Sequence, residues 1–386
     1  MRILVISNYY PPLSVGGYEI ACAQTVDWLR ARGHEVRVLT SNWRADEVPE
    51  ENHVLRVFER IDYQKGGYQQ KWQTEQFNYL RTRQELNDYA PDLVYFWSQR
   101  LISLGPVYAV QRMKFPRVFE IGDFWPDSYL KPGWKPKLKR EIKRFLPGLL
   151  GDKWRLDPVI SVAQWMVPEL RSKYGSQDIQ VVPNGLPIPK QRNTLHFNQP
   201  LKALFVGRLD PEKGLHLALE ALALLNAKGL ILPLTVAGQG DPEYSAFCRK
   251  RVSELALDDL VRFVGWQKDT DALYAEHQIL LMPTTMREPF GLVIVEAMMR
   301  GLVVFASNAY GPAEIIQDRK SGFLFQPGDS RQLANLLQEQ FANPMNLATI
   351  SQRARVYAQD TFALDRVKTQ VEAILFEKGG RAWKAA

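Results

Sequence analysis

The chain has 386 residues, 46% of them hydrophobic and 24% charged, which is ordinary for a soluble globular protein and long enough for two domains. It has no run of about 18 apolar residues, so we expect no segment to span a bilayer, and its amino terminus reads as a strand and not as a signal peptide. The two cysteines lack CxxC spacing and the five histidines form no metal-ligand pair, which indicates a reducing cytoplasm and argues against a structural metal site.

The first element is an apolar strand over residues 2–7, followed by a proline-containing loop with Gly16 and Gly17 and a helix that ends near Gly33. This order is typical of a nucleotide-binding fold. The glycine pair is not GxGxxG, however, and no acidic residue stands at the offset that a dinucleotide site needs. We therefore expect the pair either to form a simple turn or to let the backbone approach a ligand at a helix start.

Strands and helices then alternate as far as residue 182, and Asp123 stands out among the connecting loops. Strands are expected at 35–40, 54–58, 92–97, 117–121, 157–162 and 179–182, and helices at 74–88, 101–113 and 164–173. Asp123 directly follows one of these strands, and parallel sheets place ligands at the carboxyl ends of their strands. It is therefore a candidate cleft carboxylate, with helix capping or turn formation as an equal alternative.

The segment from Lys131 to Arg155 is strongly basic. It holds nine Lys and Arg against two acidic residues, together with Trp134 and Trp154 and an apolar stripe at helical spacing. Residues 1–200 hold 28 Lys and Arg against 21 Asp and Glu, whereas the remainder holds 21 of each. Two interpretations stay open, namely a core helix with a solvated basic face and a segment that docks on an anionic membrane. Nucleic acid is not expected as a partner, because no recognised binding module accompanies the charge.

A polar, proline-containing run over 187–200 predicts a linker between a first domain, 1–186, and a second, 201–361. The second domain opens with a strand at 203–206, a loop that carries Arg208 and Lys213, and a helix. Isolated cations in a loop are usually solvated. Here they lie between a strand and a helix, and no acidic DxD pair for a metal is evident, so any anionic group bound there would need such cations.

The stretch from 279 to 314 predicts a buried βαβ unit, with strands at 279–282 and 302–305 and a helix at 292–300. Glu288 lies in the first loop, and Glu296 follows eight residues later on the helix. The amides of the loop and the positive end of the helix dipole form a site where an anion can bind beside the two carboxylates. The alternative is a solvated loop acid and an acid on an ordinary helix face.

The sequence from Glu288 to Met298, followed by 311–316 and 321–324, closely resembles the E-x7-E region of retaining glycosyltransferases of family 4, the group called GT4. That resemblance implies an α/β protein of the GT-B type, with two facing Rossmann-like domains and a deep cleft between them. It implies that the last helix, within 362–386, crosses back to the first domain. Many members carry a histidine before the aspartate matched by Asp123, and Gly122 stands at that position here.

The resemblance also implies roles for individual residues. Glu288, Arg208, Lys213 and Asp123 are the expected catalytic residues. Glu296 is expected to bind the ribose and the backbone at Gly265 and Trp266 to read the base. The donor-binding set is Gly16, Gly17, Arg208, Lys213, Gly265, Trp266, Glu288, Phe290, Gly291, Leu292 and Glu296.

We therefore expect an enzyme that transfers a sugar from a nucleoside-diphosphate sugar to an acceptor hydroxyl with retention of anomeric configuration. The acceptor would be a glycan or a lipid-linked molecule. Neither a metal nor another cofactor is expected to be essential. A cytoplasmic location is expected, with a peripheral position on the inner face of the membrane as an open option. The alternatives are a sugar-nucleotide epimerase or hydrolase on the same fold, and a non-catalytic subunit that binds nucleotide sugars.

Overall fold

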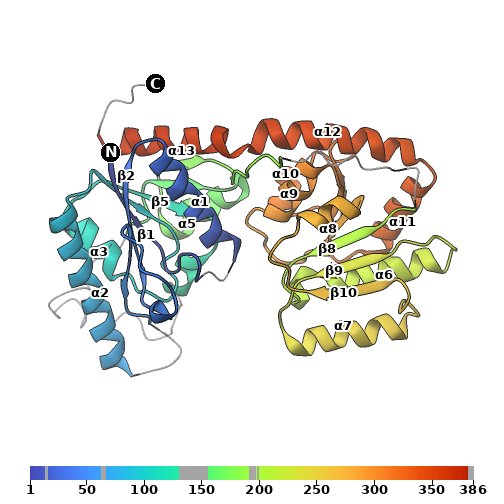
Figure 1. Cartoon of the computed structure of the whole chain (residues 1–386), viewed down its shortest axis with the longest axis horizontal. Coiled ribbons are helices and arrows are strands. Elements are labelled where there is room, and N and C mark those ends of the chain that lie inside the picture. The colour runs from blue at the N-terminus through green and yellow to red at the C-terminus, as the bar shows by residue number, and fades with distance from the viewer. Residues whose placement is uncertain (14–15, 62–66, 130–154, 191–196, 198–199, 381–386) are drawn as a thin grey trace. The chain divides into compact units, whose positions relative to one another are not determined.

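The computed structural model describes residues 1–13, 16–61, 67–129, 155–190, 197 and 200–380. The chain forms two compact units, one made of Met1–Pro183 with Val367–Ala386 and the other of Asn184–Arg366 (Figure 1). The basic segment from Lys131 to Arg155 lies outside the described residues except at its last position. Within the described part of the chain, no helix is both long enough and apolar enough to cross a membrane.

The first unit is built on a seven-stranded parallel sheet in the order β3-β2-β1-β4-β5-β6-β7. Its strands are β1 (Arg2–Ile6), β2 (Glu35–Ser41), β3 (Val54–Phe58), β4 (Leu93–Phe96), β5 (Arg117–Ile121), β6 (Val159–Ser161) and β7 (Ile179–Val181). The central strands of this sheet, β1, β4, β5 and β6, are buried along almost their whole length, as expected where a sheet is covered on both faces. The main helices are α1 (Gly17–Ala31), α2 (Tyr68–Tyr89), α3 (Gly105–Arg112) and α5 (Val167–Tyr174).

The last helix, α13 (Leu364–Lys378), belongs mostly to this first unit (Figure 1). Its residues Val367, Val371 and Leu375 recur every four positions, so they share one helix face and pack in the same core as the sheet and α1. Glu372 on this helix accepts a hydrogen bond of 2.7 Å from the ring of His34. The carboxyl-terminal helix is therefore a structural part of the unit that the amino terminus begins.

Helix α3 begins at Gly105, four residues later than the sequence predicts. Leu101 and Ser103 have left-handed backbones with φ of 67° and 75°, which an α-helix does not contain. The Ser103 hydroxyl instead accepts a 3.2 Å hydrogen bond from the amide of Gly105. A Cβ at Gly105 would lie 2.6 Å from the carbonyl oxygen of Glu75, so this helix start packs directly against the backbone of α2.

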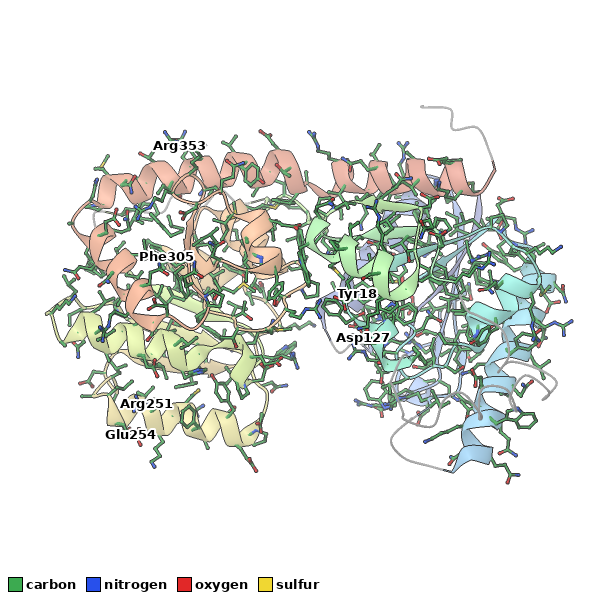
Figure 2. All side chains as sticks on the ribbon, turned by 180° about the vertical axis from the view of Figure 1, so that it is seen from behind. Tyr18, Asp127, Arg251, Glu254, Phe305 and Arg353 are labelled. Atoms are coloured by element: carbon green, nitrogen blue, oxygen red, sulfur yellow. The ribbon has the colours of Figure 1, made fainter. Side chains whose placement is uncertain are left out.

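The second unit is built on a six-stranded parallel sheet in the order β10-β9-β8-β11-β12-β13. Its strands are β8 (Ala203–Val206), β9 (Leu234–Ala237), β10 (Val261–Gly265), β11 (Ile279–Met282), β12 (Val303–Ser307) and β13 (Phe323–Phe325). The helices are α6 (Leu215–Asn226), α7 (Pro242–Glu254), α8 (Asp271–Glu276), α9 (Leu292–Arg300), α10 (Tyr310–Ile315), α11 (Ser330–Phe341) and α12 (Pro344–Phe362). Phe305 lies in the interior of this unit, whereas Arg251 and Glu254 lie on the outer side of α7 (Figure 2).

Both sheets reverse their direction of growth once. The chain starts on a central strand, adds two strands on one side, and then returns to add the others beyond the starting strand. The reversal lies between β1 and β4 in the first unit and between β8 and β11 in the second. The loops at the carboxyl ends of such a pair diverge and leave a crevice for a ligand. In the second unit, these two loops are 207–214 and 283–291.

Candidate active site

Direct backbone contacts join the two loops at the reversal point of the second unit. The carbonyl oxygen of Glu212 accepts hydrogen bonds from the amide of Thr285 at 2.8 Å and from the hydroxyl of Thr284 at 3.0 Å. Gly214 has φ of 74°, and a Cβ on it would lie 2.0 Å from the carbonyl oxygen of Pro283. Glycine is therefore required here both for its backbone conformation and for the close approach of the second loop.

The contact between these loops brings Lys213 to Glu288. The Nζ atom of Lys213 lies 2.5 Å from Oε2 of Glu288, and the two side chains are only 18% and 13% exposed. Asp210 fixes the turn before the lysine, since its Oδ1 accepts the amide of Lys213 at 3.1 Å. Its Oδ2 pairs with Arg208 at 3.2 Å, while the side chain of Arg208 is 67% exposed. The result is a shielded ion pair with a second, exposed cation on the same loop.

Glu296 has a buried partner that the sequence did not indicate. The hydroxyl of Tyr274, on α8, donates to Oε2 of Glu296 at 2.7 Å. Burial, together with the nearby carboxylate, holds the pKa of Tyr274 well above its ordinary value, so the phenol remains a donor at neutral pH. Arg300 lies over the same ring at 5.0 Å and pairs with Asp271 at 2.5 Å. The Glu296 carboxylate is thus held in one orientation on α9.

The start of α9 is also fixed in place. Gly291, with φ of 110°, precedes Leu292 at the beginning of the helix. The amide of Gly311 donates to the carbonyl oxygen of Glu288 at 3.0 Å, and a Cβ on Gly311 would lie 2.2 Å from the carbonyl oxygen of Phe290. The first amides of an α-helix have no partner within the helix, so this anchored helix start presents donors beside Glu288.

Gly265 and Trp266 lie at the end of β10, in the row of loops that follows the strands. The carbonyl oxygen of Gly265 accepts the amide of Gly238 at 2.8 Å. A Cβ on Gly238 would lie 1.8 Å from the carbonyl oxygen of Gly207, so backbone contacts connect the loops after β8, β9 and β10. Trp266 is 62% exposed. The expected base-binding turn therefore has an uncovered aromatic ring at the same edge of the sheet as Arg208.

In the first unit, the expected glycines lie at the start of α1. Gly16 has an extended backbone with φ of −166°, and its amide donates to Oε2 of Glu19 at 2.9 Å. A Cβ on Gly16 would meet no atom closer than 3.7 Å. Within the described residues, neither backbone strain nor crowding therefore requires glycine at this position.

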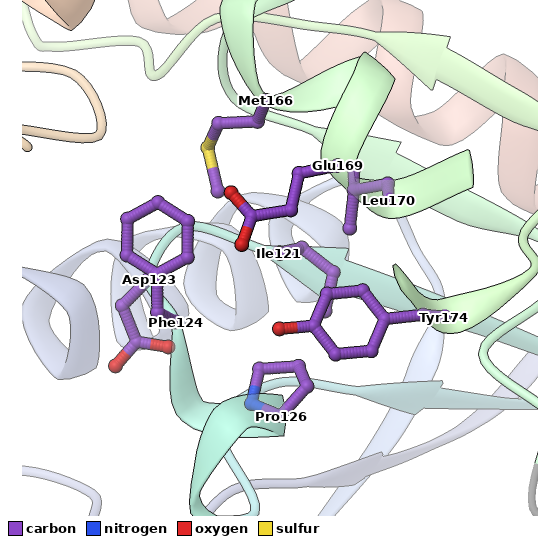
Figure 3. A pocket seen from close by; sticks show the side chains of 8 residues that line it. All are labelled: Ile121, Asp123, Phe124, Pro126, Met166, Glu169, Leu170 and Tyr174. Carbon is purple, nitrogen blue, oxygen red and sulfur yellow. The ribbon is translucent and has the colours of Figure 1, made fainter. Parts of the chain in front are cut away.

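Asp123 has the turn-forming role that was expected as one alternative, and its role as a cleft carboxylate stays a prediction. Its Oδ1 accepts the amide of Trp125 at 3.0 Å, which is turn formation, while its Oδ2 lies 3.2 Å from the guanidinium of Arg100. Burial raises the pKa of Asp123, and Arg100 opposes that rise. The carboxylate borders an apolar crevice into which the side chains of Glu169 and Tyr174 also point (Figure 3).

Tyr18 occupies the space beside Gly122. A Cβ at Gly122 would lie 2.4 Å from Cε2 and 2.7 Å from Cδ2 of the Tyr18 ring. The Tyr18 hydroxyl donates to the carbonyl oxygen of Glu120 at 2.6 Å and accepts the amide of Gly122 at 3.3 Å. The space beside position 122, where many members of the resembling family carry a histidine, is thus occupied by a tyrosine from the first turn of α1. The sequence alone gave one signal for it, the unexpected glycine at position 122.

Comparison with known proteins places the chain in a family. The model of "Glycosyltransferase Family 4" matches residues 15–188, and that of "Glycosyl transferases group 1" matches residues 188–357. The chain belongs to the family 4 glycosyltransferases. It is 27% identical to a glycogen synthase of Mycobacterium tuberculosis over 93% of this chain and 90% of that protein. It is 26% identical to the phosphatidyl-myo-inositol mannosyltransferase of Mycobacterium leprae over 87% and 86%.

Solved structures agree on the fold. Sucrose-phosphate synthase from Thermosynechococcus elongatus has a TM-score of 0.73 at 21% identity, with 97% of this chain and 98% of that one covered. Anabaena HepE in complex with UDP and glucose has a TM-score of 0.70 at 23% identity, with the same coverage. The expected fold class, α/β with Rossmann-like domains of the GT-B type, is confirmed. The described residues contain no cluster of three or more His, Cys, Asp or Glu side chains that would suit a metal ion.

Proposed function

We propose that this glycosyltransferase transfers a sugar from a nucleoside-diphosphate sugar to an acceptor hydroxyl with retention of anomeric configuration. The observation that supports the proposal best is the Lys213–Glu288 pair, which lies beside the start of α9 at the reversal point of the second sheet. A cation and helix amides suit a diphosphate, and a carboxylate suits sugar hydroxyls. The pair therefore combines the two chemistries that a nucleotide sugar requires.

The diphosphate is the leaving group in this proposal. As the bond between the anomeric carbon and the phosphate oxygen breaks, negative charge grows on the diphosphate, and we assign its binding to Lys213, Arg208 and the amides of Gly291 and Leu292. Fixed cations and dipoles stabilise that charge without reorganising during the reaction. Protein groups supply this stabilisation with no essential metal, and no protein nucleophile is required.

Glu288 and Glu296 have different roles in the proposal. Lys213 exchanges its contact with Glu288 for the diphosphate when the donor binds, which frees the Glu288 carboxylate for the donor sugar. Glu296 stays held by Tyr274 and accepts hydrogen bonds from the ribose hydroxyls. Gly265 and Trp266 contact the base. Gly16, Gly17 and Asp123, in the first unit, serve the phosphates and the acceptor.

The test has two stages. A thermal-shift screen of nucleoside diphosphates and nucleotide sugars identifies the donor, and we expect stabilisation by at least one of them because ligands that bind only the native state raise its stability. Product analysis by NMR with an acceptor panel then reports linkage and anomeric configuration. A product with inverted configuration, an epimerised donor or simple donor hydrolysis would each contradict the proposal.

We further propose that the acceptor is a glycan or a lipid-linked molecule and that the enzyme, cytoplasmic as a whole, works at an anionic membrane surface. The support is the surplus of cations between Lys131 and Arg155 and the similarity to the phosphatidyl-myo-inositol mannosyltransferase. Each cation near such a surface contributes about 1 kcal/mol, and salt screens the attraction. Sedimentation with anionic vesicles at low salt should deplete the protein from the supernatant, whereas neutral vesicles or high salt should not. Equal recovery of the protein in the supernatant under all conditions would contradict membrane docking and favour a soluble acceptor.

A further inference from the structure

Tyr18 connects two segments to which the proposed function gives separate roles, the glycine loop before α1 and the turn that carries Asp123. It directly follows Gly17 at the start of α1, and its ring and hydroxyl reach the backbone at the end of β5, just before Asp123. The hydroxyl bridges the carbonyl oxygen of Glu120 and the amide of Gly122. A single side chain thus joins the glycine loop to the turn that carries the carboxylate.

The position of the ring is determined from both sides. Trp97, at the end of β4, contacts it with ring centroids 5.1 Å apart. On the other side, the ring occupies the space where any side chain at position 122 would begin. The backbone of Gly122 does not have a positive φ. Position 122 therefore requires glycine for the Tyr18 ring and not for the path of the backbone.

The hydroxyl keeps both of its contacts over the working pH range. Burial, with Asp123 and Glu120 nearby, holds the pKa of Tyr18 well above its ordinary value. The phenol therefore stays protonated, donates to Glu120 and accepts from Gly122. Asp123, the next residue, is in turn held by Arg100 and by the amide of Trp125.

We infer that Tyr18 is a positioning residue for the transfer reaction: it fills the space that residue 122 leaves and fixes the Gly122–Asp123 turn against the glycine loop. The effect of Tyr18 on the reaction rate rests on the proposed transferase function, and the rest of the inference does not. The structural part, the hold of Tyr18 on the turn, can be measured without any substrate.

The first experiment uses Tyr18→Phe, which keeps the ring and removes only the hydroxyl. Tyr89→Phe is the matched control, because the hydroxyl of Tyr89 donates to a backbone carbonyl of the same unit, that of Glu35, at 2.9 Å and at the opposite end of the sheet. Hydrogen exchange should become faster in the peptide that contains Gly122 and Asp123 for Tyr18→Phe but not for Tyr89→Phe. Unchanged exchange in Tyr18→Phe would overturn the inference.

Kinetics then separate positioning from a merely structural role. Tyr18→Phe should lower kcat by roughly 5- to 20-fold with donor KM changed less than twofold, because a misplaced group near the reaction costs turnover more than binding. Tyr89→Phe should lose comparable thermal stability and keep its kcat. Wild-type kcat in Tyr18→Phe would overturn the positioning role. A wild-type protein that lacks transfer activity would overturn the proposed function instead, and the exchange experiment would still decide whether Tyr18 holds the turn.

A pair of alanine variants tests the steric part. Gly122→Ala should loosen the same peptide in hydrogen exchange when Tyr18 is present, because the new Cβ collides with the ring. In the Tyr18→Ala background, the added Gly122→Ala change should have little further effect, because the space is then empty. Equal effects of Gly122→Ala in the two backgrounds would show that the ring does not fill this position.

Discussion

Lys213 and Glu288 form an ion pair, but the proposed function assigns them to different parts of the donor. In the structure, each satisfies the other in a site that is mostly shielded from water. A diphosphate must compete with Glu288 for Lys213, so the carboxylate lowers the affinity for the leaving group while it serves the donor sugar. The two residues should therefore be separable by comparing binding with turnover.

We expect Lys213→Ala to weaken binding of the nucleoside diphosphate by about 1 to 3 kcal/mol, because a charge-assisted contact is lost. Glu288→Gln should lower turnover and leave that affinity unchanged or improved. Isothermal titration and steady-state kinetics measure the two effects. Lys228→Ala is the control, since the ammonium group of this lysine donates to Gln338 on the surface of the same unit. An unchanged affinity in Lys213→Ala would show that this lysine does not bind the diphosphate.

Glu296 and its partner Tyr274 allow a graded test of the ribose contact. Glu296→Gln should lower the affinity for the free nucleoside diphosphate about tenfold, because an amide accepts hydroxyl hydrogen bonds less strongly than a carboxylate. Tyr274→Phe keeps the carboxylate and loses only its orienting donor, so we expect a loss of about threefold or less. The same titration reports both. A larger loss for Tyr274→Phe than for Glu296→Gln would mean that the carboxylate does not contact the nucleotide.

At the scale of single residues, the sequence identified candidate residues but not the partners that they contact. Spacing and resemblance singled out Lys213, Glu288 and Glu296, and the motif provides no information on what each contacts in the folded chain. Lys213 and Glu288 are 75 residues apart, and their contact depends on backbone hydrogen bonds between two loops. Tyr274 lies on α8, which has no recognisable motif, so only the fold identifies it. Tyr18 follows the glycine pair, but only the fold shows that its ring contacts Gly122.

Among the elements, the predicted bounds of a helix were accurate where the sequence carries a clear signal for its ends. Helix α9 has the bounds expected from the sequence, Leu292–Arg300, with Gly291 before it and Gly301, at φ of 87°, after it. For α3, the apolar periodicity extended over Leu101–Leu104, which the structure uses in a tight left-handed turn. Glycine marks a helix end in the sequence, whereas a left-handed leucine or serine leaves no such mark.

The loop before α6 provides a stability prediction. Gly214→Ala should lower the free energy of unfolding by roughly 3 kcal/mol or more, because the new Cβ has a strained φ and collides with the carbonyl oxygen of Pro283. Gly229→Ala is the matched control, since Gly229 has the same φ of 74° and no atom within 4 Å of the added Cβ. It should cost only about 1 to 2 kcal/mol of strain.

Urea unfolding measures both glycine variants. The difference between them isolates the collision from the backbone strain that they share. Nucleotide affinity should fall as well in Gly214→Ala, because the collision displaces Lys213, and it should stay unchanged in Gly229→Ala. Equal destabilisation of the two variants would show that the loops around Gly214 and Pro283 separate easily.

For the whole molecule, the α/β class followed from the alternation of apolar strands and helices, and the GT-B type followed from the resemblance. Two buried charges at α13 did not follow from either. Glu120 and Lys368 are each 2% exposed, and the hydroxyl of Tyr95 donates to the Glu120 carboxylate. Burial raises the pKa of Glu120 to about 7, with Lys368 and Tyr95 opposing the rise, while burial lowers the pKa of Lys368.

This buried acid predicts how stability depends on pH. Between its unfolded pKa near 4.3 and its folded pKa, the native chain holds a proton that the unfolded chain releases, so stability falls as pH rises from about 4.5 to about 7. Glu120→Gln should remove that fall, which amounts to roughly 1 to 3 kcal/mol. Lys368→Met should extend the fall in stability to higher pH, because Lys368 no longer opposes the rise in the pKa of Glu120. Urea unfolding between pH 4.5 and 8 measures the slope. The exposed Glu254→Gln is the control, and an unchanged slope in Glu120→Gln would contradict the prediction.

The place of α13 in the core of the first unit also has a consequence for the order of synthesis. The chain enters the first unit, leaves it after Pro183 and re-enters it at Val367, so the second unit is an insertion within the first. A ribosome completes all of Asn184–Arg366 before it releases the residues that close the core around Val371 and Leu375. The second unit can therefore finish folding first. The apolar core of the first unit stays partly uncovered until α13 has been synthesised.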